Sequence, residues 1–124
     1  MQHILIVEDS PTMRSLVVSA LEDLGRITEA ASGFEALREL PRGDYDLIVT
    51  DINMPDINGL ELISFVRRNA AYQSIPMLII STEGSERDRE KGLELGADAY
   101  LVKPFDPAAL RRTAKELLEK ARGE

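Results

Sequence analysis

The chain has 124 residues, enough to bury one sizeable core and too few for two ordinary domains, so we expect a single domain over residues 1–124. Its 22 acidic residues outnumber 15 lysines and arginines, and a net charge of −7 without a basic patch disfavours nucleic-acid binding. The lack of cysteine excludes disulfides and thiolate metal sites, and the lack of a signal peptide or a run of roughly 20 apolar residues indicates a cytoplasmic protein.

Five short apolar runs alternate with five segments of helical periodicity. The strands are expected at residues 3–8, 26–31, 45–50, 75–81 and 99–103, and the helices at 11–24, 33–40, 59–69, 85–95 and 107–121. Right-handed crossovers must bury helices on both faces of such a sheet. We therefore predict an α/β fold, a doubly wound five-stranded parallel sheet in the order 2-1-3-4-5 within a flavodoxin-like three-layer sandwich.

For several residues the sequence indicates a structural role and not a functional one. In the first helix, Leu16 is expected to join an apolar stripe that packs on the sheet, and Met54 to be a packing or loop residue. The only histidine, His3, is expected to be an exposed residue at a strand edge. The charged run at 85–91 is expected to be a solvated face, and the weakly apolar helix 85–95 to be mobile.

Reactive polar residues follow the strong strands. These residues are Glu8 and Asp9, Asp51, Ser81 and Lys103. The carboxyl ends of parallel strands share one edge, where ligands bind, so these side chains should converge there. Any one of them alone would ordinarily be a solvated loop residue, but a separate apolar strand precedes each position. Three neighbouring carboxylates repel one another, and Mg2+ is the cation that best relieves this repulsion with hard oxygen ligands.

Asp51 is the most central of these carboxylates and can act as a nucleophile toward a phosphoryl donor. Phosphoryl transfer requires in-line positioning and charge neutralisation. Mg2+ would contact one phosphoryl oxygen, Lys103 a second, and the Ser81 hydroxyl with a backbone N–H the third. The sequence therefore predicts an aspartyl phosphate at Asp51.

Four motifs carry a resemblance to a known family: EDS at 8–10, DINMPDING at 51–59, ST at 81–82 and GADAYLVKPF at 96–105. Over residues 3–121 the chain resembles a receiver domain of the two-component response regulator family, and more narrowly the single-domain chemotaxis regulators of the CheY type. The resemblance implies that Asp51 accepts a phosphoryl group from a sensor histidine kinase. It implies a switch that signals by protein contact and catalyses its own aspartyl phosphorylation and dephosphorylation, and not a conventional enzyme.

The resemblance also implies roles for individual residues. Asp9, Asp51 and the backbone carbonyl of Asn53 would bind Mg2+, with Glu8 acting through water. Ser81, Thr82 and Lys103 would surround the phosphoryl oxygens, and the bulk of Thr82 is expected to slow exchange with small donors. Lys103 would precede a cis peptide to Pro104. Ser81 and Tyr100 would form a switch that reshapes the surface of the fourth helix, fifth strand and fifth helix, where an unidentified protein target binds.

Other functions use the same fold. A phosphorelay or phosphate-sink receiver, which passes the group to a histidine phosphotransfer protein, has the same chemistry and stays an alternative. A flavodoxin-like cofactor binder is disfavoured because Glu8 and Asp9 would repel a phosphate. An aspartate-nucleophile phosphohydrolase would need an acid where Asn53 stands. We expect neither nucleic-acid nor membrane partners, and a monomer or weak dimer.

Overall fold

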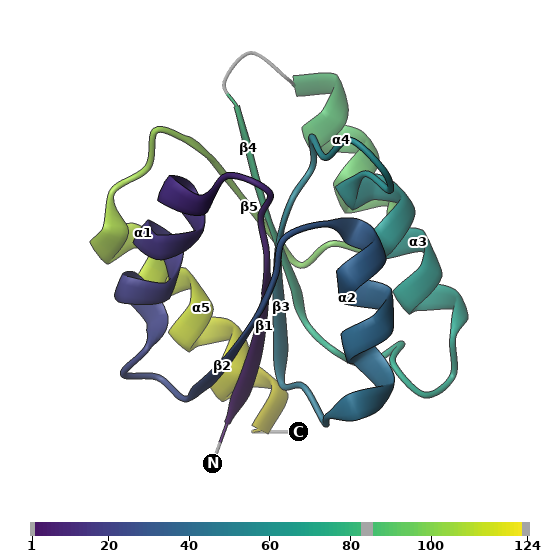
Figure 1. Ribbon diagram of the computed structural model, residues 1–124, viewed down its shortest axis with the longest axis horizontal. Helices are drawn as coiled ribbons and strands as arrows, with labels where there is room; N and C mark the ends of the chain where they lie inside the picture. Colours follow the sequence, from purple (N-terminus) through teal and green to yellow (C-terminus); the bar gives the residue numbers. More distant parts are fainter. Residues whose placement is uncertain (1, 83–85, 123–124) are drawn as a thin grey trace.

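The computed structural model describes residues 2–82 and 86–122, and its side-chain description excludes residues 82, 121 and 122. Five parallel strands form one sheet in the order β2-β1-β3-β4-β5, as predicted (Figure 1). The strands are β1 (His3–Val7), β2 (Arg26–Ala30), β3 (Leu47–Asp51), β4 (Met77–Thr82) and β5 (Ala99–Lys103).

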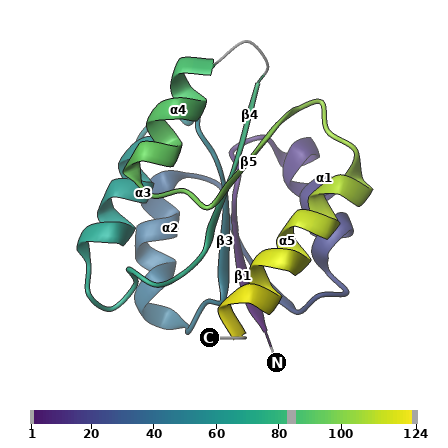
Figure 2. The same ribbon diagram turned by 180° about the vertical axis from the view of Figure 1, so that it is seen from behind.

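Helices cover both faces of the sheet. They are α1 (Pro11–Leu21), α2 (Gly33–Glu39), α3 (Gly59–Arg68), α4 (Glu86–Leu95) and α5 (Pro107–Arg122), with a short 3-10 turn η1 (Leu40–Arg42) after α2. Figures 1 and 2 show α1 and α5 on one face and α2, α3 and α4 on the other. The predicted three-layer, doubly wound architecture is confirmed. None of the helices in the described ranges is long and apolar enough to cross a membrane.

The core lies in two layers, one on each face of the sheet. All five residues of β1 and all five of β3 are buried, which explains the consecutive apolar residues 4–7 and 47–49 within them. In α1, Val17 and Leu21 are buried against the sheet, but Leu16 is 40% exposed. The prediction that Leu16 faces inward is therefore wrong, because the buried side of α1 is narrower than its apolar stripe.

Local signals in the sequence set the start of α3, which follows the loop after Asp51. Asn58 Oδ1 accepts a hydrogen bond from the N–H of Glu61 at 2.9 Å, and Glu61 Oε1 accepts one from the N–H of Asn58 at 3.1 Å. This reciprocal capping box satisfies two backbone donors at the helix terminus. The end of the loop is thus fixed by its own side chains.

The fourth helix forms despite its charge. Glu86, Arg87, Glu90 and Lys91 are exposed, so the expected solvated face is confirmed for the described part of the run. Gly92 is buried and allows α4 to approach Ile79 of β4. Ser85 lies outside the described residues, and the mobility of this helix stays a prediction.

His3 is a buried residue, with only 8% of its surface exposed, so the expected exposed edge residue is wrong. Its Nε2 lies 2.6 Å from Thr28 Oγ1, and its ring packs on Tyr45 with centroids 4.4 Å apart. The Arg26 guanidinium lies 3.4 Å from Nδ1 and can only donate, so Nδ1 accepts and Nε2 carries the proton. Thr28 of β2 and Tyr45, which precedes β3, contribute to this burial, and the local sequence around His3 could not reveal it.

We expect His3 to make stability depend on pH. Burial, and next the positive charge of Arg26, lower the pKa of His3 below its usual 6.5, while Asp46 opposes them. The unfolded chain therefore binds the proton more readily, and stability should fall as pH drops below 6.5. Chemical denaturation between pH 5 and 8 checks this, and a His3→Gln variant should lose that part of the slope. An equal slope in both proteins would contradict the prediction.

Candidate functional site

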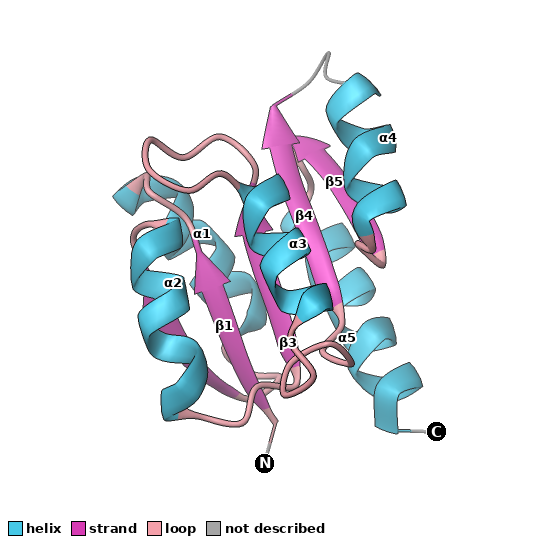
Figure 3. Cartoon of the chain, turned by 90° about the vertical axis from the view of Figure 1, so that its right-hand side faces the viewer, coloured by secondary structure: helices cyan, strands magenta, loops and turns pink. Residues whose placement is uncertain are grey.

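Strand pairing brings the predicted residues to one edge of the sheet. Val7 pairs with Thr50, Asp51 with Ile80, and Thr82 with Lys103. Figure 3 shows the strand arrowheads directed toward the same edge. The residues that end or follow β1, β3, β4 and β5 therefore lie together at the carboxyl end of the sheet.

Asp51 is the last residue of β3 and is only 5% exposed. Its backbone carbonyl accepts a hydrogen bond from Thr50 Oγ1 at 3.0 Å, and Gly59 N donates to the carbonyl of Ile52 at 2.8 Å. A Cβ atom at Gly59 would collide with the Asp51 carbonyl oxygen, so only glycine lets α3 begin this close to the strand. The backbone around the carboxylate is thus closely packed.

Lys103 lies between two buried carboxylates. Its Nζ is 3.1 Å from Glu8 Oε1, with which it forms a hydrogen bond, and 3.4 Å from Asp51 Oδ1. The other oxygen of Glu8 accepts a hydrogen bond from the N–H of Ser10 at 3.1 Å. Glu8 is 3% exposed and the Lys103 side chain 14%, so these charges interact in a largely desolvated place.

Burial makes the carboxylates of Glu8 and Asp51 more basic. Burial raises the pKa of Asp51, although Lys103 and the N–H groups of Ile52 and Asn53 oppose the increase. Burial is also the largest cause that raises the pKa of Glu8, and the charge of Asp51 adds to it against the Ser10 N–H and Lys103. The two buried acids Glu8 and Asp51 thus share one cation, which leaves this pair one positive charge short.

The donor set fits a divalent cation. One oxygen from each of Glu8, Asp9 and Asp51 lies within 4.8 Å of the others. Lys103 contacts Asp51 Oδ1 only as an ion pair, and this buried oxygen has no hydrogen-bond partner among the described residues. Buried polar atoms are ordinarily paired, so a hard cation is the ligand that this oxygen and its neighbours suit.

The other predicted residues lie around this cluster. Asn53 is exposed in the loop after β3, and Ser81 is fully buried in β4. Tyr100 of β5 is half-buried, with the Arg89 guanidinium carbon 5.9 Å from its ring centroid. Thr82 ends β4, but its side chain lies outside the described part. The cis peptide between Lys103 and Pro104 is present.

The response regulator receiver domain family matches residues 4–115 of this sequence. The chain belongs to this family. It is a phosphorylation-activated response regulator of a two-component system. The family match does not favour the alternative of a phosphorelay or phosphate-sink receiver. The receiver domain is not a conventional enzyme.

Individual relatives agree with this assignment. A chemotaxis protein CheY homolog of Campylobacter jejuni is 37% identical over 124 residues, covering 98% of this chain and 95% of the relative. The structure of the chemotaxis response regulator CheY4 of Vibrio cholerae matches with a TM-score of 0.86 at 36% identity, covering 94% of this chain and 98% of that one. A signal receiver domain of a histidine kinase from Syntrophus aciditrophicus matches with a TM-score of 0.88 at 33% identity, covering 97% and 92%.

Two residues of the receiver domain that support the site were not found from the sequence. The Arg14 guanidinium donates to the backbone carbonyl of Glu8 at 2.9 Å and pairs with Glu29 at 3.1 Å. Asp56 connects the loop after β3 to the start of α2. The sequence around Arg14 or Asp56 does not indicate these contacts, because the residues that they contact lie in other segments of the chain.

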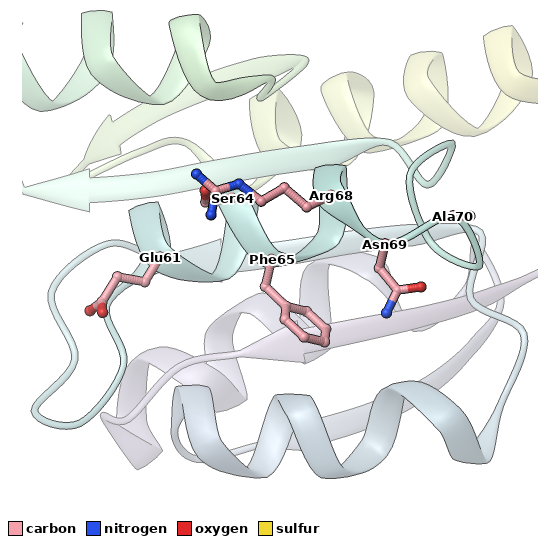
Figure 4. A pocket seen from close by; sticks show the side chains of 6 residues that line it. All are labelled: Glu61, Ser64, Phe65, Arg68, Asn69 and Ala70. Carbon is pink, nitrogen blue, oxygen red and sulfur yellow. The ribbon is translucent and has the colours of Figure 1, made fainter.

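A hollow beside α3 lies away from the candidate site residues. The hollow has a volume of about 580 Å³. In Figure 4, Phe65 projects from α3, and Asn69 lies just after the last residue of this helix. Its lining residues are Glu61, Ser64, Phe65, Arg68, Asn69 and Ala70. It includes none of the candidate site residues, so it is separate from the candidate site at the carboxyl edge of the sheet.

Proposed function

We propose that Asp51 is the residue that accepts the phosphoryl group. The observation that carries this proposal is the buried Asp51 Oδ1, which lacks a hydrogen-bond partner within the described part and faces both an acidic cluster and Lys103. An exposed aspartate would be solvated and an ordinary buried one fully hydrogen-bonded. A desolvated carboxylate oxygen that has a cation beside it but accepts no hydrogen bond is suited to nucleophilic attack on phosphorus.

The proposal includes a Mg2+ ion held by Asp9, Asp51 and the backbone carbonyl of Asn53. Glu8 is already engaged by Lys103 and the Ser10 N–H, which supports contact with the ion through water. Bound Mg2+ neutralises charge on the phosphoryl oxygens. Lys103 and the Ser81 hydroxyl, with Thr82 beside it, contact the other oxygens. With these residues the domain catalyses its own aspartyl phosphorylation and dephosphorylation.

The same proposal covers the phosphodonor and the way in which the phosphorylated domain signals. A sensor histidine kinase supplies the phosphoryl group, and the chemotaxis relatives support signalling through contact with a protein target. Movement of the Ser81 hydroxyl and the Tyr100 ring would reshape the surface of α4, β5 and α5, where the target binds. We further propose one domain over residues 1–124 that acts in the cytoplasm as a monomer or weak dimer.

Mass spectrometry after incubation with acetyl phosphate and Mg2+ tests the phosphoacceptor. The wild-type protein should gain the mass of one phosphoryl group, and Asp51→Asn should gain none. Asp44→Asn is the matched control, since Asp44 is an exposed acid before β3, at the opposite end of that strand. A mass gain that survives in Asp51→Asn would refute the assignment.

A further inference from the structure

The loop after β3 is connected to α2 by the carboxylate of Asp56. Its Oδ1 accepts a hydrogen bond from the N–H of Gly33 at 3.3 Å, and its Oδ2 accepts one from the N–H of Phe34 at 3.0 Å. The N–H of Ile57, and further those of Phe34 and Gly33, lower the pKa of Asp56, so the carboxylate is charged at neutral pH. These bonds join segments 22 and 23 residues apart in the chain.

The N-terminal donors of α2 are divided between two side chains. Ser32 Oγ accepts from the N–H of Glu35 at 3.1 Å, so this local cap serves one donor of the first turn. The N–H groups of Gly33 and Phe34 go to Asp56 instead. The start of α2 therefore depends on a residue from the loop of the candidate site.

The loop is held at further points. A Cβ atom at Gly33 would collide with the carbonyl oxygen of Ile57, so the two backbones are in close contact beside the Asp56 bonds. Met54 is 8% exposed and belongs to the core cluster under α2 and α3. Asn53 lies between Asp51 at one end of this loop and the Met54 anchor. The backbone of Asn53 is thus positioned by contacts of neighbouring loop residues, and none of these contacts involves the acidic cluster.

We propose that Asp56 is a positioning residue that sets the Mg2+ affinity of the site by holding the loop in the conformation that directs the Asn53 carbonyl at the ion. The inference rests on the proposed role of Asn53 as a Mg2+ ligand. It adds that the Mg2+ affinity depends on the bonds between Asp56 and α2. Residues that orient metal ligands contribute to affinity because a preformed site loses less conformational entropy on binding.

Three variants separate positioning from simple helix capping. Asp56→Ala removes both bonds to α2, Asp56→Asn keeps one side-chain oxygen as an acceptor, and Ser32→Ala removes a cap from the same helix without touching the loop. Mg2+ dissociation constants are measured by NMR titration of backbone amides, and melting temperatures are measured without Mg2+. Half-saturating Mg2+ for phosphorylation by acetyl phosphate gives a second readout.

We expect Asp56→Ala to raise the Mg2+ dissociation constant about tenfold, as loss of a residue that orients a ligand does. Asp56→Asn should lie between this variant and the wild type. Ser32→Ala should lower the melting temperature and leave the dissociation constant unchanged. At saturating Mg2+, the phosphorylation rate of Asp56→Ala should equal that of the wild type.

Two results would overturn the inference while leaving the proposed function intact. One is a wild-type Mg2+ affinity in Asp56→Ala, and the other is an equal loss of affinity in Ser32→Ala, which would assign the effect to helix stability. If the wild-type protein shows no saturable Mg2+ binding, the proposed metal site fails, and the role of Asp56 fails with it.

Discussion

Replacing Lys103 by methionine should lower the free energy of unfolding by about 3 kcal/mol at neutral pH, because it leaves buried charge uncompensated. Lys103 lies within ion-pair distance of both Glu8 and Asp51, at 3.1 and 3.4 Å. Methionine keeps much of the length and the apolar stem but removes the charge. The two carboxylates would then repel each other in a desolvated place.

The effect of this substitution should depend strongly on pH. Burial already raises the pKa of Glu8 and of Asp51, and Lys103 opposes the increase at both residues. Without Lys103 both pKa values rise further, so the folded variant binds protons more readily than the unfolded chain. Its stability should therefore increase as pH falls from neutral, and the difference from the wild type should shrink.

Urea denaturation at several pH values, without Mg2+, measures the effect of Lys103→Met. Lys91→Met is the control, since Lys91 is an exposed lysine of α4 and its loss should cost less than about 0.5 kcal/mol. Added Mg2+ should restore part of the stability of Lys103→Met by supplying the missing positive charge. Equal stabilities for the two variants would mean that Lys103 does not balance the buried acids.

The sequence was sufficient to predict the sheet and the convergence of the site. Each strong strand is a short apolar run, and parallel pairing places all carboxyl ends at one edge, so Glu8, Asp51, Ser81 and Lys103 could be brought together without coordinates. Periodicity and turn residues determine these features locally. The resulting prediction included the residues of the acidic cluster found in the structure.

What the sequence did not reveal depends on contacts between distant segments. The burial of His3 comes from Thr28 and Tyr45 on other elements, and nothing in its own surroundings indicates this. Asp56 follows a proline in a loop and reads as a turn residue, although its partners are N–H groups of α2. Leu16 fits the helical period of α1 but lies beyond the part of the helix that the sheet covers.

Asp51→Asn should abolish phosphorylation and, without Mg2+, increase the free energy of unfolding by about 1 to 2 kcal/mol, because a neutral amide of the same size costs less to bury beside Glu8 than a carboxylate does. The side chain keeps its size, loses its charge and no longer repels Glu8. Since burial raises the pKa of Asp51 above its usual 3.8, the folded wild type binds the proton more readily than the unfolded chain. The penalty is therefore largest above the raised pKa and disappears as pH falls below 3.8.

Mg2+ should reverse the order of the two proteins. An ion that binds only the folded state stabilises it by about 2.7 kcal/mol at one hundred times its dissociation constant, which exceeds the expected gain of Asp51→Asn. Asp51→Asn removes a central ligand and should gain little, whereas Asp9→Asn should lose Mg2+ stabilisation without any gain in its absence, because Asp9 is exposed. Thermal denaturation of the three proteins with and without Mg2+ measures both effects. A wild type more stable than Asp51→Asn in the absence of Mg2+ would show that Lys103 alone compensates the buried charge of Asp51.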